Sequence, residues 1–244
     1  MRGAGLEALP FCLMNIASFL SGSLDVSLLV DTIKYKRDFR KQHPDFFDPS
    51  GILVFCGPQG AGKTLSSVQY VRKLAEKYPK MILVTNVEIK GLPIAVYPYT
   101  GIADFSKYSN GFEGVVYLID EIHIEFNSLE SKNIDPSVMT EIAQQRKQRK
   151  HIVGTSQVFG RIAKPFREQF KYVVLCRCLW GVLQYNTLID GERAMVDDDG
   201  HLEAETVKRY FWWHKPELYD SYNTYAKIIR SKDRRIQSGY GGGN

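Results

Sequence analysis

Short apolar runs alternate with longer amphipathic segments between residues 50 and 180. The runs are rich in Val, Ile and Leu and lack a strict apolar–polar alternation, which predicts strands buried on both faces of a parallel sheet. We expect these strands at 52–56, 81–87, 94–97, 115–120, 151–156 and 171–176. Apolar residues at helical spacing predict helices at 63–77 and 136–149. This order of elements indicates an α/β fold with a mostly parallel central sheet flanked by helices.

The chain before this alternating core predicts a helix. From Val26 onward the apolar residues Val26, Leu29, Val30 and Ile33 fall on one helix face. A basic run follows at 34–41, which suits either a solvated helix end or contact with phosphate. Two prolines then mark a linker, so we assign residues 1–49 to an N-terminal helical segment.

The chain after the core differs in character. Residues 171–190 predict two strands joined at Trp180-Gly181, a hairpin that ends a core domain of residues 50–190. Residues 191–244 then form a C-terminal arm with a flexible basic tail. Aromatic residues at 210–213 could stack on bases, but such residues more often pack on the domain or lie between subunits.

A glycine-rich loop stands between the strand at 52–56 and the helix at 63–77. Its eight residues match G-x-x-x-x-G-K-[ST] in the strand–loop–helix context that this motif requires. Glycines let backbone N–H groups approach phosphate oxygens, and the helix N-terminus adds further donors. We therefore expect ATP to bind at Gly57, Pro58, Gln59, Gly60, Ala61, Gly62, Lys63, Thr64 and Leu65. Lys63 would neutralise the β- and γ-phosphates and Thr64 would ligate Mg²⁺, whereas the alternative is a turn that binds nothing.

The strand at 115–120 ends in two carboxylates, Asp120 and Glu121. Asp120 fits the acid that organises Mg²⁺ and its waters. Glu121 is the candidate general base for the water that attacks the γ-phosphate. The alternative is a pair of carboxylates at an exposed strand end.

A polar sequence, Thr155-Ser156-Gln157, ends the strand at 151–156. A side chain at the end of a strand beside the one that carries Asp120 can contact the γ-phosphate and respond to its loss. Gln157 is the candidate for this sensor, although the same composition is common in turns.

These three motifs together resemble the FtsK–HerA superfamily of ring-forming, DNA-pumping P-loop ATPases. The resemblance covers about residues 50–178 and implies an ASCE/RecA-like P-loop NTPase fold, with an extra strand supplied by 81–87. It implies a sensor strand that ends in a glutamine, which Gln157 matches. It also implies an arginine that reaches the neighbouring subunit's nucleotide. Arg146 matches that arginine, with Arg149 as its substitute; compensation of a helix dipole is the alternative role.

Two branches of the superfamily compete. The compact chain is similar to genome-packaging ATPases of tailless viruses. That resemblance implies a double-stranded DNA substrate, a homo-oligomeric, hexameric ring, and capsid or portal-vertex proteins as partners. The sequences at 85–87 and 161–167 resemble those of Zot-type filamentous phage assembly proteins, which normally carry a membrane-spanning segment. A conjugative DNA-transfer ATPase is a further alternative. A polar loop at 122–135, with Lys132, would contact DNA in a pore or lie on the surface.

Net charge, cysteine content and the most apolar stretch bear on the partners, metal sites and membrane segments that we expect. A formal charge of +5 permits a polyanionic partner without requiring one. The four cysteines lack the spacing of a metal site and are expected to be reduced, as in a cytosolic protein. The most apolar stretch, 11–30, is interrupted by polar residues, so we expect no transmembrane segment. The expected location is the host cytoplasm, at a capsid vertex or a membrane complex.

Overall fold

The computed structural model describes residues 26–126, 140, 142–162, 164–196 and 202–223. The chain divides into two units, residues 1–44 and residues 45–244. In the first unit, helix α2 (Val26–Gln42) confirms the helix predicted from Val26. Its apolar side chains Leu29 and Ile33 are exposed. Among the described helices, none has the length and apolar character needed to cross a membrane.

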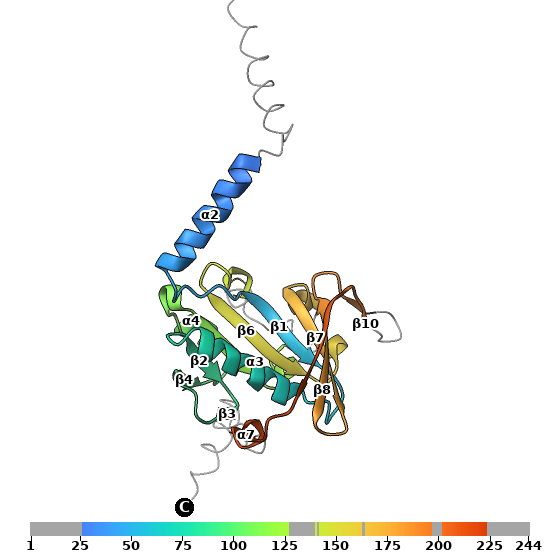
Figure 1. Ribbon diagram of the computed structural model, residues 1–244. Coiled ribbons are helices and arrows are strands. Elements are labelled where there is room, and N and C mark those ends of the chain that lie inside the picture. The colour runs from blue at the N-terminus through green and yellow to red at the C-terminus, as the bar shows by residue number, and fades with distance from the viewer. Residues whose placement is uncertain (1–25, 127–139, 141, 163, 197–201, 224–244) are drawn as a thin grey trace, which may run out of the picture. The chain divides into compact units, whose positions relative to one another are not determined.

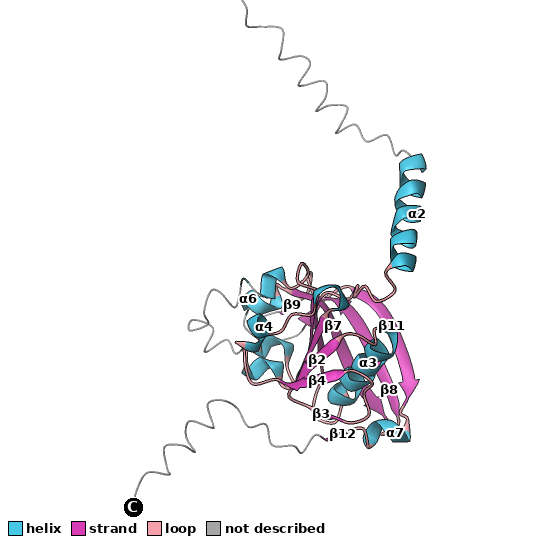
Figure 2. Cartoon of the chain, turned by 90° about the vertical axis from the view of Figure 1, so that its left-hand side faces the viewer, coloured by secondary structure: helices cyan, strands magenta, loops and turns pink. Residues whose placement is uncertain are grey.

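A mixed sheet organises the second unit (Figures 1 and 2). In the described residues it has eight strands, in the order β11-β8-β7-β1-β6-β5-β2-β4. All neighbours from β7 to β4 pair in parallel, whereas β8 is antiparallel to both β7 and β11. The strands are β1 (Gly51–Cys56), β2 (Ile82–Thr85), β4 (Ala95–Pro98), β5 (Val115–Ile119), β6 (Lys150–Ser156), β7 (Phe170–Leu179), β8 (Leu183–Asp190) and β11 (Thr206–Trp213).

Shorter elements complete the unit. Two small sheets pair β3 (Glu88–Ile89) with β12 (Tyr222–Asn223), and β9 (Met195–Val196) with β10 (Leu202–Glu203). The remaining described helices are α3 (Lys63–Lys77), α4 (Asp104–Lys107), α6 (Lys164–Arg167) and α7 (Pro216–Tyr219), with single 3₁₀ turns at Gly111–Glu113, Ile122–Ile124 and Phe159–Arg161.

Apolar cores cover both faces of the central strands. On β1, Leu53 and Phe55 belong to a core that includes Val68 and Val71 of α3. The alternating residues, including Ile52 and Val54, belong to a second core on the other face, with Phe126, Phe166 and other side chains. Burial on both faces explains why the strand sequences are continuously apolar. It confirms the expected α/β architecture.

Several predicted boundaries are close to the observed ones, and helix α3 matches its prediction. The run at 81–87 is wrong as a single strand, since β2 ends at Thr85. There the Thr85 hydroxyl accepts a hydrogen bond from the N–H of Val87 at 3.0 Å, which turns the chain. The hairpin predicted over 171–190 is confirmed, since β7 ends at Leu179 and pairs with β8 from Leu183 onward. The end expected at residue 176 for its first strand is too early for the same reason.

The helix expected at 136–149 needs a correction at its C-terminal end. Residues 136–139 and 141 lie outside the described residues, residues 140 and 142–144 are helical, and residues 145–149 form turns. Arg149 has a φ of 56°, in the left-handed region, and Lys150 donates its N–H to the carbonyl of Gln145 at 2.9 Å. Arg146 therefore lies in the turn that leads into β6 and not on the helix.

The aromatic stretch at 210–213 forms the second half of strand β11, the edge strand beside β8. Trp212 packs against the core on the α3 side. Phe211 and Trp213 project to the other face and are exposed. The sheet therefore continues into the segment that follows residue 190.

Candidate active site

The phosphate loop leaves the carboxyl end of β1 and enters α3. Gly60 and Gly62 have φ values of 79° and 78°, in the left-handed region that residues with a Cβ rarely adopt. A Cβ on Gly62 would also lie 2.1 Å from Oε1 of Gln184. Helix α3 begins directly after Gly62, so its first N–H groups are directed toward the loop. The loop thus has the geometry of an anion-binding site.

Gln184 on β8 holds this loop by hydrogen bonds, a role that was not predicted from the sequence. Its side-chain amide donates to the carbonyl of Ala61 at 2.9 Å and to Oδ1 of Asn186 at 2.9 Å. Asn186 in turn donates to the hydroxyl of Ser66 on α3 at 3.2 Å. Both amide residues are fully buried. A Gln-x-Asn pair in a strand was the available signal, but its partners lie more than 100 residues away.

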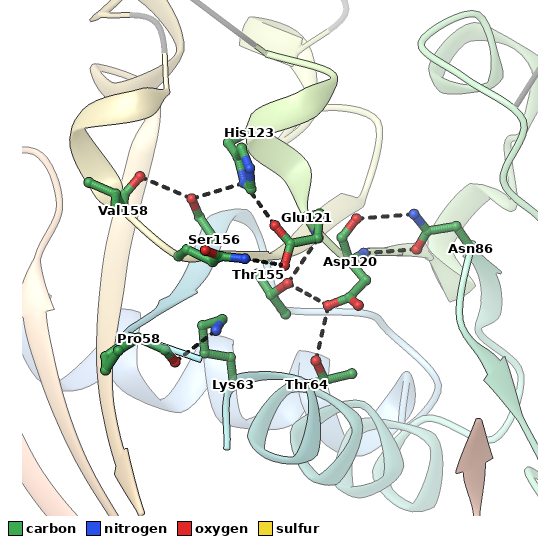
Figure 3. Close-up of polar contacts among 11 residues, drawn as sticks. Pro58, Lys63, Thr64, Asn86, Asp120, Glu121, His123, Thr155, Ser156 and Val158 are labelled. Atoms are coloured by element: carbon green, nitrogen blue, oxygen red, sulfur yellow. Dashed lines mark hydrogen bonds and ion pairs between the residues drawn. The ribbon is translucent and has the colours of Figure 1, made fainter. Parts of the chain in front are cut away.

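Lys63 and Thr64 stand at the first turn of α3 (Figure 3). The ammonium group of Lys63 donates to the carbonyl of Pro58 at 3.0 Å, across the loop. The hydroxyl of Thr64 donates to Oδ1 of Asp120 at 3.1 Å, which joins the phosphate loop to the end of β5. The two predicted metal-side residues are therefore in direct contact.

The donors around Asp120 fit Mg²⁺. A hydroxyl and one carboxylate supply hard oxygen ligands, and Mg²⁺ usually takes one or two carboxylates with waters and substrate phosphates. In the residues that the structure describes, no group of three or more His, Cys, Asp or Glu side chains gathers as a metal cage. This donor set suits a Mg²⁺ ion delivered with a nucleotide.

Two residues hold Asp120 and Glu121 in place. Thr155 on β6 donates its hydroxyl to Oδ1 of Asp120 at 2.5 Å and accepts the N–H of Glu121 at 3.0 Å. The side chain of Asn86, after β2, accepts the N–H of Asp120 at 2.8 Å and donates to its carbonyl at 3.1 Å. The backbone of both residues and the carboxylate of Asp120 are thus held from the strands on both sides of β5. Neither Asn86 nor Thr155 was expected to hold these two residues, because both contacts join residues more than 30 positions apart.

Glu121 adopts an unusual backbone conformation for a residue with a side chain. Its φ is 56°, and such strain in a non-glycine residue is concentrated at functional sites. One carboxylate oxygen lies 3.2 Å from Nδ1 of His123, which is also 3.3 Å from the hydroxyl of Ser156. The other oxygen accepts a hydrogen bond from Nε2 of Gln157 at 3.5 Å. His123 is a neighbour of Glu121 that the sequence analysis did not single out.

Strand order explains why these groups meet. Strand β6 lies between β1 and β5, and all three are parallel. The carboxyl ends of parallel strands lie on the same side of a sheet, so Gln157, which follows β6, lies beside Glu121, which follows β5. The sequence-predicted Lys63, Thr64, Asp120, Glu121 and Gln157 all gather on this side.

Arg146 lies at the opposite ends of the strands, before the first residue of β6. It is exposed, and a seven-residue strand of roughly 20 Å separates it from Gln157. Arg149 stacks on the ring of Phe46 with 3.9 Å between its Cζ and the ring centroid, and it donates to the carbonyl of Phe47 at 3.5 Å. Neither arginine is close to the phosphate loop of its own chain. The expected loop residue Lys132 lies outside the described residues.

Two cysteines lie beside the phosphate loop, and both are free thiols. Burial raises the pKa of the Cys176 thiol to about 12 and also raises that of Cys56. Buried neutral thiols of this kind are poor nucleophiles. They act as packing residues, as expected from the sequence.

Comparison with solved structures bears on the fold alone. Neither a family model nor a curated protein matches the sequence. Among solved structures, the N-terminal domain of zonular occludens toxin from Neisseria meningitidis is 15% identical, covers 72% of this chain and 100% of its own, and has a TM-score of 0.51. The genome packaging NTPase B204 from Sulfolobus turreted icosahedral virus 2, in complex with AMPPCP, is 11% identical over 64% of this chain and 97% of its own, with a TM-score of 0.46. The protein has the α/β fold of the P-loop NTPases, as expected.

Proposed function

We propose that this protein is a Mg²⁺-dependent ATP hydrolase. The observation that carries the proposal is the contact network Thr64–Asp120–Thr155–Glu121–Gln157, which joins a phosphate loop to a carboxylate base and a polar sensor. The network brings together side chains from the first turn of α3 and from the carboxyl ends of β5 and β6, which a turn without catalytic function would not require.

Each residue has a role in this reaction. Thr64 and Asp120 would hold Mg²⁺, which when bound neutralises charge on the phosphates. Lys63 would exchange its bond with Pro58 for contacts to the β- and γ-phosphates. Glu121 would take the proton of the attacking water, while His123 fixes its carboxylate. Gln157 bonds to Glu121 and would exchange that contact when the γ-phosphate is present.

We further propose that hydrolysis drives double-stranded DNA through a homo-oligomeric, hexameric ring and packages a viral genome in the host cytoplasm. The motif resemblance and the mild positive charge support this role. In such a ring Arg146 would complete the neighbouring subunit's site, because it lies too far from its own. Capsid or portal-vertex proteins would be the natural partners.

The second candidate is a Zot-like ATPase that drives filamentous phage assembly. One observation favours it: the Neisseria meningitidis domain is matched over its whole length. Both candidates use the same catalytic site, so only the cargo differs.

DNA-stimulated hydrolysis separates the two candidates. ATP turnover by the full chain would be measured with and without blunt duplex DNA, with Lys63→Ala as the blank for contaminating activity. The packaging role predicts faster turnover with duplex. Hydrolysis at the same rate with and without DNA would contradict DNA translocation but leave the ATP hydrolase assignment intact.

A further inference from the structure

One face of the sheet edge formed by β7, β8 and β11 carries aromatic and basic side chains. Arg177, Tyr185 and Phe211 are register partners across the three strands and therefore point to the same face. The next row has Leu179, Leu183 and Trp213, and the preceding row has Leu175, Thr187 and Arg209. We call these nine residues the open face; β8 and β11 lie at one edge of the sheet in Figure 2.

The open face differs from the reverse side of the same strands. On the reverse side, Gln184, Asn186 and Cys176 are at most 5% exposed because they pack toward α3 and the phosphate loop. On the open face, Phe211 is 71% exposed and Trp213 is 62% exposed. Neighbouring side chains on one face of a strand stand roughly 7 Å apart, so these two rings form adjacent flat surfaces.

The charge of the open face has one sign. Arg177 and Arg209 are exposed, and neither forms an ion pair within the described residues. None of the nine side chains is acidic. A hollow of about 440 Å³ lies over this face, bounded on one side by Leu202 and Ala204, and Arg177, Tyr185 and Arg209 line it. A negatively charged group can therefore approach the hollow without meeting a carboxylate of the open face.

We propose that the open face binds single-stranded nucleic acid. Exposed rings on a sheet are stacking surfaces for bases, and arginines beside them bind the backbone phosphates. Duplex DNA does not offer this contact, since its base faces already stack on one another. The chemistry thus favours an unpaired strand. The site is distinct from the nucleotide site and does not depend on the proposed ATP hydrolysis.

Binding of a fluorescein-labelled oligothymidylate by the full chain tests this proposal. Fluorescence anisotropy would be measured without ATP, so that a failure of the ATPase proposal would not affect the result. Wild-type protein should bind this strand more tightly than a duplex of equal length. Phe211→Ala and Trp213→Ala should each weaken binding at least about fivefold, because each removes a stacking ring. Arg209→Ala should lower the salt slope by about 0.7.

Matched variants separate the open face from general effects. Phe112→Ala removes another exposed ring and Lys107→Ala removes another exposed cation, and both should bind like wild type. Phe211→Tyr with Trp213→Phe keeps both rings and should retain binding if the alanine variants lose it through stacking rather than misfolding. Equal affinity for duplex and single strand, or wild-type binding by Phe211→Ala and Trp213→Ala, would overturn the proposal. So would alanine variants that change only the oligomeric state, since the face would then be a contact between copies.

Discussion

The side-chain amide of Gln184 donates a hydrogen bond to the carbonyl of Ala61 at 2.9 Å and so ties strand β8 to the phosphate loop. Its oxygen lies 3.2 Å from Nε2 of His214, which follows β11. The antiparallel edge of the sheet is therefore connected to the nucleotide site by a buried polar contact. Strand β8 therefore helps to hold the phosphate loop in its conformation.

Gln184→Leu should destabilise the fold and the loop together. Loss of this amide leaves buried polar groups of Ala61 and Asn186 without their partner, which costs about 1–3 kcal/mol. We expect a lower free energy of unfolding in urea and a weaker affinity for ATP. Thr187→Val, on the same strand but the other face, is the control and should bind ATP normally. Unchanged ATP affinity in Gln184→Leu would separate β8 from the loop.

Thr155→Val should impair catalysis through the metal. The hydroxyl of Thr155 bonds to both Asp120 and Glu121, and such outer partners of metal ligands are typically worth about 10–100-fold in activity or metal affinity. We expect a higher Mg²⁺ concentration for half-maximal turnover. Thr155→Ser keeps the hydroxyl and should restore most of the activity. If Thr155→Val and Thr155→Ser have the same turnover and the same Mg²⁺ dependence, the hydroxyl has no such role.

His151 should make stability depend on pH. Burial lowers the pKa of this histidine to about 4, while its ring bonds to the carbonyl of Gly51 at 2.8 Å and to the hydroxyl of Tyr70 at 3.0 Å. The unfolded chain, with a pKa near 6.5, binds the proton more readily, so stability is full above about pH 6.5 and falls toward pH 4. The loss from this group is up to about 3 kcal/mol.

Urea unfolding at several pH values measures this dependence. His151→Gln should flatten the curve between about pH 4 and 6.5, since it removes the titrating group. His43→Gln, at an exposed position outside the sheet unit, should leave the curve unchanged. A wild-type slope in His151→Gln would assign the dependence to other groups.

Arg146 can be tested by mixing two inactive proteins. Lys63→Ala lacks the loop's cation and Arg146→Ala lacks the proposed trans arginine, so each alone should fail to hydrolyse ATP. In an equal mixture, about a quarter of the sites would combine an intact Lys63 with an intact Arg146 from the neighbour, if sites are shared. We expect activity to return on mixing. Arg149→Ala should stay active but less stable, because its guanidinium packs on Phe46.

The sequence was most informative where the physical signal is local. An apolar run, a glycine-rich loop and a helical pattern follow one another without a gap, so β1, the loop and α3 were predicted closely. The carboxylates at 120 and 121 could also be identified from the sequence, because they follow directly after an apolar strand. Their meeting with Thr64 then followed from the parallel sheet.

Other features depend on contacts between distant residues. Gln184 reaches Ala61 across 123 positions, and Asn86 reaches Asp120 across 34, so no local pattern identifies them. The aromatic stretch of β11 lacks a clean alternation, since both faces of the strand carry rings. The helix before β6 ends early because the chain turns at residues 145–149, whereas the apolar stripe predicted that it continued.

The central claim is that Glu121 activates water at a site completed by Thr64 and Asp120. The most direct measurement is single-turnover hydrolysis of ATP by Glu121→Gln beside wild type, with nucleotide affinity measured on the same samples. The account predicts that hydrolysis falls about 10²–10⁴-fold while ATP binding and Mg²⁺ dependence of binding persist. Hydrolysis by Glu121→Gln at the wild-type rate would contradict it.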